Sequence, residues 1–523
     1  MKKTIYVFVA MAALLLCVGA TWASTFEDGA AARERGDYAN AVGIFRLLAA
    51  QGDVRAQSSL GGMYRKGSGV AQDYVEAAKW FRLAAARGDA KAQASLGVMY
   101  GSGLGVTQDY TEAVKWHRLA AAQGLAQAQF NLGVMYDEGH GVAQDYAEAV
   151  KWYRLAAAQG LAQAQFNLGV MYGRGESVTQ DYVEAVKWYR LASVQGLAQA
   201  QASLGLMYDE GHGVAQDYAE AVKWYRFSAV QGDARAQTNL GAKYSSGQGV
   251  SKDYAESIKW TRLAAAQGDA QAQSNLGFMY EEGQGVAKNY AEAVKWYRLA
   301  SAQGNAIAQN NLGAKYSKGQ GVAKNYAEAI KWYRLAAAQG YAKAQANLGA
   351  MFDKGQGVAK NFAEVLKWYQ LAAAQGNSGA QHNLGLMYDK GRGVTQDYEE
   401  AVKWYQLAAV QGESSAQTNL GLMYDEGHGV AQDYAEAVKW YRLAAAQGDA
   451  RAQFNLGGMY SKGDGVTQDY VSAHMWFGLS AVKGNSMAVK NRDITEKLMT
   501  PQQIVQAQKM ASDCQRRNFK GCD

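Results

Sequence analysis

The side chains best suited to chemistry in this 523-residue chain are its six histidines, which are scattered along the sequence. They are His117, His140, His212, His382, His428 and His474. No two of them have the spacing of a helical zinc site. A catalytic site also needs its nucleophile, base or metal ligands in one place, whereas almost every polar group here is copied at a fixed interval. We therefore expect no enzymatic activity, no metal and no cofactor.

Three of the histidines lie in the repeated segment Asp-Glu-Gly-His-Gly, in which carboxylates beside an imidazole could bind a divalent cation. The segments are residues 137–141, 209–213 and 425–429. The same places elsewhere hold Arg65 and Lys66, or Ser317 and Lys318, so the acidic pair is not required by the pattern. A solvated turn is the favoured interpretation of these segments.

The elements that position these side chains repeat with a period of 36 residues, seen most plainly in tryptophan. The series is Trp80, Trp116, Trp152, Trp188, Trp224, Trp260, Trp296, Trp332, Trp368, Trp404, Trp440 and Trp476. A period of this length marks a solenoid of stacked units. The core is expected to grow by stacking rather than as one large globule.

Each 36-residue repeat is predicted to contain two helices joined by a glycine-containing loop. Residues 126–136 place apolar side chains at helical spacing and form the first helix of one unit. The second helix begins after Asp145, a good N-cap, and ends at Gly160. Trp152 and Leu155 are expected to extend the apolar face of this second helix, and the tryptophans to form a stacking core rather than a sugar-binding platform.

The chain begins with the pattern of a secretory signal peptide. Lys2 and Lys3 precede a short apolar run and small residues, so we expect cleavage after Ala23, or after Ala20. No later run resembles a membrane span, so the mature protein is expected to be periplasmic or secreted, without an integral membrane segment. Without the two lysines the formal charge falls from +6 to +4, a balance that does not suggest a nucleic-acid partner.

Four segments follow from these patterns. They are a signal peptide at 1–23, N-terminal capping helices at 24–52, twelve full repeats at 53–484, and C-terminal capping helices with a tail at 485–523. Atypical end units are what a solenoid needs to close its apolar stacking surfaces. In the last segment, Thr500, Pro501 and Gln503 predict the start of a final helix with a capping box.

The repeated motifs resemble the Sel-one-like repeat (SLR) family over residues 53–484. They are Ala-Gln-x-Asn-Leu-Gly-x-Met-Tyr, a Gly-x-Gly-Val loop, and Asp-Tyr-x-Glu-Ala-x-Lys-Trp-Tyr. The resemblance implies an all-α fold, an α/α solenoid of tandem helix hairpins in a right-handed superhelix, related to tetratricopeptide repeats. It also implies an adaptor for protein complexes, since exported bacterial members often serve in host interaction or envelope signalling.

Positions that vary between repeats are the candidates for a binding face, because a stacking face cannot vary. One position, two residues before the motif leucine, corresponds to a concave-facing position in the related tetratricopeptide fold. The candidate partner-binding residues there are Ser58, Phe130, Phe166, Thr238, Asn310, His382 and Phe454. Exposed phenylalanines would be plausible anchors for a partner. Relaxed packing with no ligand remains an equal alternative at this position.

Two further patterns have structural and functional interpretations. Gln129 and its equivalents in every repeat could form an amide ladder that holds an extended peptide, although an amide that ties a helix to a loop is favoured. Lys151 and Arg154 could form a basic stripe for a phosphate-rich surface, although a solvated face with weak ion pairs is favoured.

The sequence therefore predicts an exported, non-enzymatic scaffold that binds a protein partner through its concave face. One alternative is a cell-wall or glycan-associated envelope regulator. Another is an envelope hydrolase, which is disfavoured because relatives with that suggested activity carry a cysteine pair in each repeat. Here Cys17 leaves with the signal, so Cys514 and Cys522 are expected to pair in an oxidising compartment.

Overall fold

The computed structural model describes residues 24–519, 521 and 522, in which every regular element is an α-helix. The predicted signal peptide at 1–23 lies outside the described residues. Within them, no helix is long and apolar enough to cross a membrane. The chain divides into two compact units, one ending at Trp260 and one beginning at Thr261, which are described separately.

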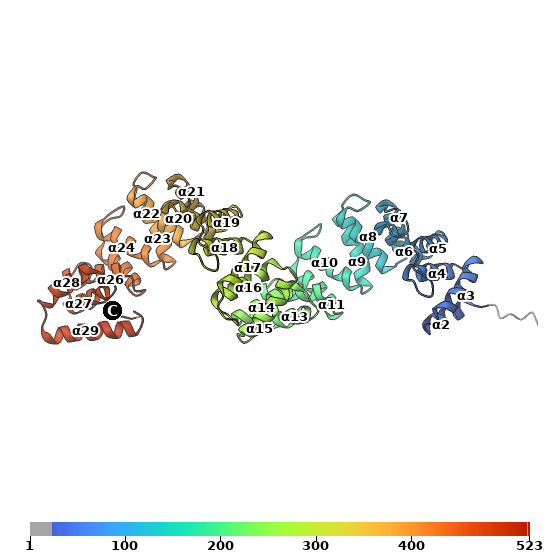
Figure 1. Ribbon diagram of the computed structural model, residues 1–523, viewed down its shortest axis with the longest axis horizontal. Coiled ribbons are helices and arrows are strands. Elements are labelled where there is room, and N and C mark those ends of the chain that lie inside the picture. The colour runs from blue at the N-terminus through green and yellow to red at the C-terminus, as the bar shows by residue number, and fades with distance from the viewer. Residues whose placement is uncertain (1–23, 520, 523) are drawn as a thin grey trace, which may run out of the picture. The chain divides into compact units, whose positions relative to one another are not determined.

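The helices follow one another as antiparallel hairpins along each unit (Figure 1). The first unit contains α2 Phe26–Glu34, α3 Tyr38–Ala50, α4 Val54–Lys66, α5 Tyr74–Ala86, α6 Ala90–Ser102, α7 Tyr110–Ala122, α8 Ala126–Glu138, α9 Tyr146–Ala158, α10 Ala162–Arg174, α11 Tyr182–Val194, α12 Ala198–Glu210, α13 Tyr218–Val230 and α14 Ala234–Ser246. Helix α15, Tyr254–Ala266, includes the boundary between the units.

The second unit continues the same alternation and ends with two atypical helices. It contains α16 Ala270–Glu282, α17 Tyr290–Ala302, α18 Ala306–Lys318, α19 Tyr326–Ala338, α20 Ala342–Lys354, α21 Phe362–Ala374, α22 Ser378–Lys390, α23 Tyr398–Val410, α24 Ser414–Glu426, α25 Tyr434–Ala445, α26 Ala450–Lys462, α27 Tyr470–Val482, α28 Ser486–Glu496 and α29 Pro501–Arg516. The predicted all-α solenoid of tandem hairpins is confirmed.

Local sequence signals explain where the helices begin and end. The Asp145 carboxylate accepts hydrogen bonds from the first-turn amides of Ala147 and Glu148, as expected of an N-cap. At the end of α8, Gly139 adopts a left-handed conformation with φ of 72°. That conformation favours glycine, and it turns the chain into the loop before the second helix.

Most hairpins are held together by a buried tyrosine of the second helix, seen in α9. The Tyr153 side chain is fully buried, and its ring lies against Gly133 of α8, where an added Cβ would come within 2.7 Å of the ring. The glycine thus allows a close approach between the two helices. Trp152 is half-buried and packs against a cluster that contains Val114 of the preceding hairpin and Leu132 of its own hairpin. The tryptophans therefore stack neighbouring repeats, as the sequence predicted.

Leu155 does not extend the buried face, so this expectation was wrong. Its side chain is 49% exposed, and the equivalent leucines of other second helices are also exposed, except Leu479 of α27, which is buried in the C-terminal cluster. A helix turns by about 100° per residue, which puts Leu155 about 200° round from the buried Tyr153. The leucine consequently shares the outer side of α9 with Lys151.

A buried amide ties each first helix to the end of the preceding second helix. Gln129 Nε2 donates to the Ala121 carbonyl oxygen at 3.3 Å, and Gln129 Oε1 accepts from Gln159 Nε2 at 2.8 Å. The first of these bonds has an equivalent in all twelve predicted repeats. The structural interpretation of this glutamine is confirmed, with a helix end in place of a loop as its partner.

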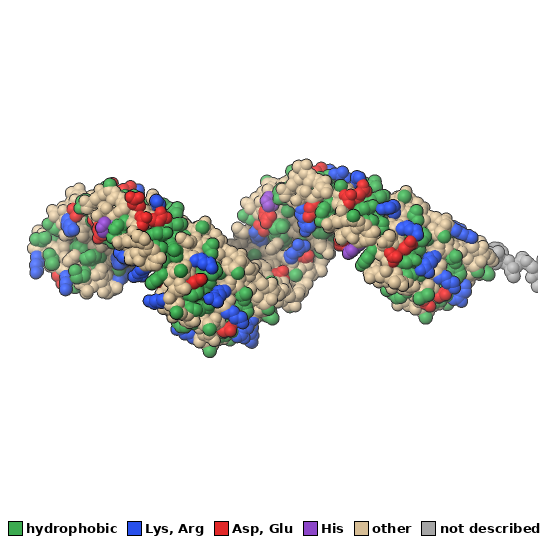
Figure 2. Space-filling view, turned by 90° about the horizontal axis from the view of Figure 1, so that it is seen from above, with side chains coloured by type: hydrophobic (Ala, Val, Ile, Leu, Met, Phe, Trp, Pro, Cys, Tyr) green, Lys and Arg blue, Asp and Glu red, His purple; other side chains and the backbone are tan. Residues whose placement is uncertain are grey.

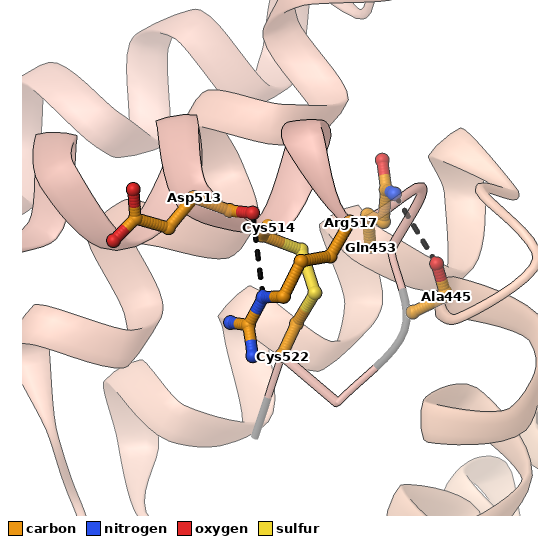
Figure 3. The surroundings of a disulfide bond; sticks show 6 residues. All are labelled: Ala445, Gln453, Asp513, Cys514, Arg517 and Cys522. Carbon is orange, nitrogen blue, oxygen red and sulfur yellow. Dashed lines mark hydrogen bonds between the residues drawn. A yellow bond between two sulfur atoms is a disulfide. The ribbon is translucent and has the colours of Figure 1, made fainter.

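The C-terminal end closes the second unit with α28 and α29. Thr500 and Gln503 form the predicted capping box at the start of α29. Cys514 of α29 is joined to Cys522 by a disulfide, shown in Figure 3. Both cysteines are buried in a cluster with Trp476 of α27, so the tail is fixed against the last repeat.

Candidate partner-binding face

The variable position lies on a side of each first helix that also carries the residues one and four positions later in the chain. We call this side the first-helix face and define it in α8 by Phe130, Asn131 and Val134, with the equivalent residues in the other first helices. Four hollows, of about 240, 340, 410 and 710 Å³, are lined mainly by residues of first helices, and each includes residues of this face. Four of the predicted binding residues line them, namely Ser58, Phe130, Phe166 and Asn310.

The three phenylalanines at this position are half-buried and lie against an aromatic ring of the following second helix. The ring centroids of Phe130 and Tyr153 are 5.9 Å apart, and Phe166 lies 5.8 Å from Tyr189. Phe454 lies 5.7 Å from Phe477 in the same way. Each ring thus presents one side to a hollow or to solvent and the other side to the core.

Phe130 forms part of an apolar hollow of about 240 Å³ with Val98, Val134 and His117. Burial of His117 lowers its pKa to about 4, so its imidazole is neutral at pH 7. This histidine occupies the second-helix position that holds Tyr153 in the next repeat, and it belongs to the packing of the hairpin. A neutral, apolar depression of this kind suits an apolar side chain of a partner.

His382 is also engaged within the chain. Its ring lies 5.9 Å from that of Tyr405, and its Nε2 is 3.1 Å from Asn419 Nδ2. Burial lowers the pKa of His382, which favours the neutral ring. The Ser58 hydroxyl similarly donates to Asp89 Oδ1 at 3.0 Å. Both side chains are half-buried and remain in part on the face.

Thr238 and Asn310 differ from the other predicted residues because they are only 5% and 6% exposed. Thr238 Oγ1 donates to the Ala234 carbonyl oxygen, and Asn310 Oδ1 accepts from Asn347 Nδ2 at 2.9 Å. Both side chains are therefore almost fully buried, although Asn310 still lines the hollow of about 340 Å³. Their role in partner binding stays a prediction. Short polar side chains at this position fold back onto the helix or its neighbour, whereas phenylalanine is too large to do so.

Two buried ion pairs join neighbouring first helices and were not predicted from the sequence. Lys243 pairs with Asp209, and Lys315, only 2% exposed, pairs with Glu281. Both lysines replace the buried methionine of other repeats. The sequence signal that could have predicted the ion pairs is this lysine at a position that is otherwise apolar. A buried cation requires a partner carboxylate, and each acid stands 34 residues earlier in the chain.

The acidic residues of the first-helix ends also accept hydrogen bonds from the buried tyrosines. Tyr153 Oη donates to Asp137 Oδ2 at 3.0 Å, and Tyr225 Oη donates to Asp209 Oδ2 at 3.2 Å. Burial first, and then the nearby carboxylate, raise the pKa of each tyrosine well above its ordinary value. These phenols therefore remain protonated donors, and the acids are committed to the fold.

The Asp-Glu-Gly-His-Gly loops are built as packed turns. His140 Nδ1 lies 3.0 Å from Glu138 Oε2, and the imidazole stacks on Tyr110 at 4.8 Å between ring centroids. The stacks of His212 on Tyr182 and of His428 on Tyr398 have the same form. Among the described residues no three potential metal-ligating side chains come together.

The second helices do not present a free basic stripe. Lys151 pairs with Glu148 three residues earlier, and Arg154 Nη2 donates to the Tyr172 hydroxyl of the next first helix at 2.6 Å. Figure 2 shows basic and acidic side chains interspersed over the surface in view. The charges are locally compensated, as expected of a solvated face.

The repeats match a known family along most of the chain. The Sel1 repeat model matches twelve consecutive segments, from residues 54–89 to residues 450–485. No curated protein matches the chain.

Two solved structures of the same type are similar to the chain. The c5321 protein, a protective antigen present in uropathogenic Escherichia coli strains and displaying an SLR fold, is 42% identical with a TM-score of 0.72. That match covers 85% of this chain and 96% of c5321. A Sel1 repeat protein from Oxalobacter formigenes is 33% identical over 59% of this chain and 89% of its own, with a TM-score of 0.46. The chain belongs to the Sel1 repeat family.

Proposed function

We propose that this protein is an exported, non-enzymatic scaffold that binds a protein partner on its first-helix face. Sel1 repeats are typical of scaffolds for protein–protein interaction. The observation that carries the choice of face is the position of the hollows. All four are lined mainly by first-helix residues, and each includes positions at which the side chain varies between repeats. Such a face can be specific for one partner while the stacking core stays constant.

The location outside the cytoplasm is supported by two features of the sequence. Lys2 and Lys3 precede an apolar run as in secretory signals, and the two remaining cysteines are placed to pair. The similar c5321 protein is described as a protective antigen, which fits a protein that antibodies can reach. N-terminal sequencing of the protein from fractionated cells tests this part. A periplasmic or secreted chain that begins after Ala23 or Ala20 is expected, and a cytoplasmic chain that retains Met1 would contradict export.

The binding face is tested by photo-crosslinking from two matched positions. Val98 on the first-helix face of α6 and Leu83 on the outer side of α5 are both 45% exposed. A photoreactive phenylalanine analogue is placed at each in turn, and irradiation is carried out in cells that make the protein. We expect a crosslinked partner protein from position 98 and none from position 83. Crosslinks from position 83 alone, or from neither position, would overturn the proposed face.

A further inference from the structure

The largest of the four hollows, about 710 Å³, differs from the others in charge. It lies beside the first full repeat and involves α2 to α6. Arg33, Arg65, Lys66 and Lys91 line it, together with aromatic and serine side chains. None of the described residues that line it is acidic. The hollow is therefore a concentrated basic site in a chain whose other charges are largely compensated.

The hollow near Phe166 shows what compensation looks like on the same face. Its two arginines, Arg174 and Arg235, share the lining with Asp137 and Glu176. The two sites are built from equivalent parts of neighbouring first helices, so their different charges are a property of their sequences and not of the repeat geometry.

Arg65 is the residue that inverts the pattern. The equivalent positions hold carboxylates in several repeats, including Asp137 and Asp425, which accept hydrogen bonds from the tyrosines Tyr153 and Tyr441. In the first repeat the tyrosine is replaced by Phe81, which has no hydroxyl group. The donor and the acceptor of this internal hydrogen bond are thus both absent where Arg65 stands.

The Arg65 side chain is partly exposed and lines the hollow. Among the described residues no carboxylate pairs with its guanidinium. A charged group without a counter-charge in its own chain is available to pair with an anion that enters the hollow. Two acids next to the lining residues Phe26 and Ser58 are already engaged. Glu27 pairs with Arg55 at 3.1 Å, and Asp89 both accepts from Ser58 and caps α6.

Two other first helices show which group pairs with a lysine side chain of a first helix. Lys243 is held by the carboxylate of Asp209 and Lys315 by that of Glu281, each from the preceding repeat. At the first repeat no described residue provides such a carboxylate to Arg65. The chain's own residues 1–23 contain no Asp or Glu and cannot provide one either.

We propose that this hollow binds an acidic segment of a protein partner, with a carboxylate paired to Arg65. Arg33, Lys66 and Lys91 add to the attraction, and the aromatic wall packs against the apolar part of the segment. Guanidinium groups pair with carboxylates through strong charge-assisted hydrogen bonds. The proposal rests on the proposed function, because it assigns a partner chemistry to one end of the first-helix face.

The test measures binding of a fluorescein-labelled hexaglutamate peptide to the purified chain by fluorescence anisotropy at low salt. We expect Arg65→Ala to weaken binding by about tenfold or more, the scale of one lost charge-assisted pair. The double variant Arg65→Asp with Phe81→Tyr recreates the pairing found in other repeats, so it should fold normally and lose binding. Arg174→Ala is the matched control, because it removes the same charge from the hollow near Phe166. The affinity of this variant for hexaglutamate should change by less than about twofold.

Three outcomes would overturn the proposal. They are no binding of hexaglutamate by the unaltered chain, unchanged binding by the double variant, and an equal loss with Arg174→Ala. Inorganic pyrophosphate is titrated as a second probe, and tighter binding of it than of the peptide would assign the site to phosphate instead. Crosslinking from position 98 is measured separately, so loss of the acidic-peptide site alone would leave the proposed binding face standing.

Discussion

The first and second helices of each repeat carry the same fold but obey different constraints. In α9 the residues that contact other helices, such as Tyr153 and Trp152, recur along the chain with few exceptions. In α8 the residues at the positions of Phe130 and Val134 change from repeat to repeat. The difference shows that stacking fixes one helix on most of its surface, while the other keeps a face that evolution can alter without disturbing its neighbours.

Two residues show that recurrence and burial are separate properties. Leu155 recurs in nearly every second helix although its side chain is half exposed. Thr238 occupies a position that varies, and yet it is almost fully buried. A variable position is therefore one at which several side chains satisfy the same space, and how much of it stays open depends on the side chain that occupies it.

The largest effect is expected from the residue that joins the two kinds of helix. Tyr153→Ala should lower the free energy of unfolding by about 3–5 kcal/mol, because it removes a fully buried ring and leaves a cavity beside Gly133. Leu155→Ala on the same helix should cost less than about 1 kcal/mol, since half of that side chain is already in water. Chemical denaturation followed by circular dichroism measures both. Equal losses would contradict the assignment of Leu155 to the outer side.

The next effect concerns the end of the chain, where no further repeat covers the stack. Cys514→Ser should destabilise the C-terminal helices by about 2–3 kcal/mol, the value expected from the entropy of a small closed loop. Hydrogen exchange of α27 and α29 measures the loss, and added reductant should reproduce it in the unaltered protein. Free thiols at both cysteines in protein exported without reductant would contradict the pairing.

The repeat architecture could be predicted from sequence because period, caps and glycines are local signals. Asp145 and Gly160 mark the ends of a helix whatever the helix packs against. The outward direction of Leu155 could not be predicted as easily, because the apolar residues of this helix extend almost all the way round it. The packing of the neighbouring helices decides how much of the surface of this helix is buried.

The candidate site was less predictable than the fold. The variable position can be predicted by comparing repeats, but its burial depends on the side chain, so Phe130 is half-buried whereas Asn310 is almost fully buried. Arg65 was noticed only as an exception to an acidic pattern. In the first repeat, Arg65 of α4 stands where other repeats have a carboxylate, and Phe81 of α5 stands where they have its tyrosine partner. The sequence alone does not show that these two positions are in contact.

A smaller effect, dependent on pH, separates His117 from the tyrosines at its position. Its pKa of about 4 lies below the value of about 6.5 in an unfolded chain, so the unfolded state binds more protons between these values. Stability is therefore lost as the pH falls from about 6.5 toward 4, by about 2 kcal/mol at pH 5. His117→Phe should remove this loss, because Phe81 shows that the ring fits. Melting temperatures at pH 7 and pH 5 measure it, with Tyr153→Phe as a control that leaves the pH dependence unchanged.

The smallest effect on stability is expected at the variable position itself. Phe130→Ala and Phe166→Ala should each cost about 1 kcal/mol of unfolding free energy, because each ring is only half-buried against a tyrosine. Together they should weaken partner binding by at least ~2 kcal/mol, the scale expected of interface anchors. The comparison with Tyr153→Ala separates two roles for aromatic rings that touch each other. If the double variant melts as early as Tyr153→Ala while partner affinity is untouched, these phenylalanines belong to the core, and the first helices have no more binding function at this position than the second.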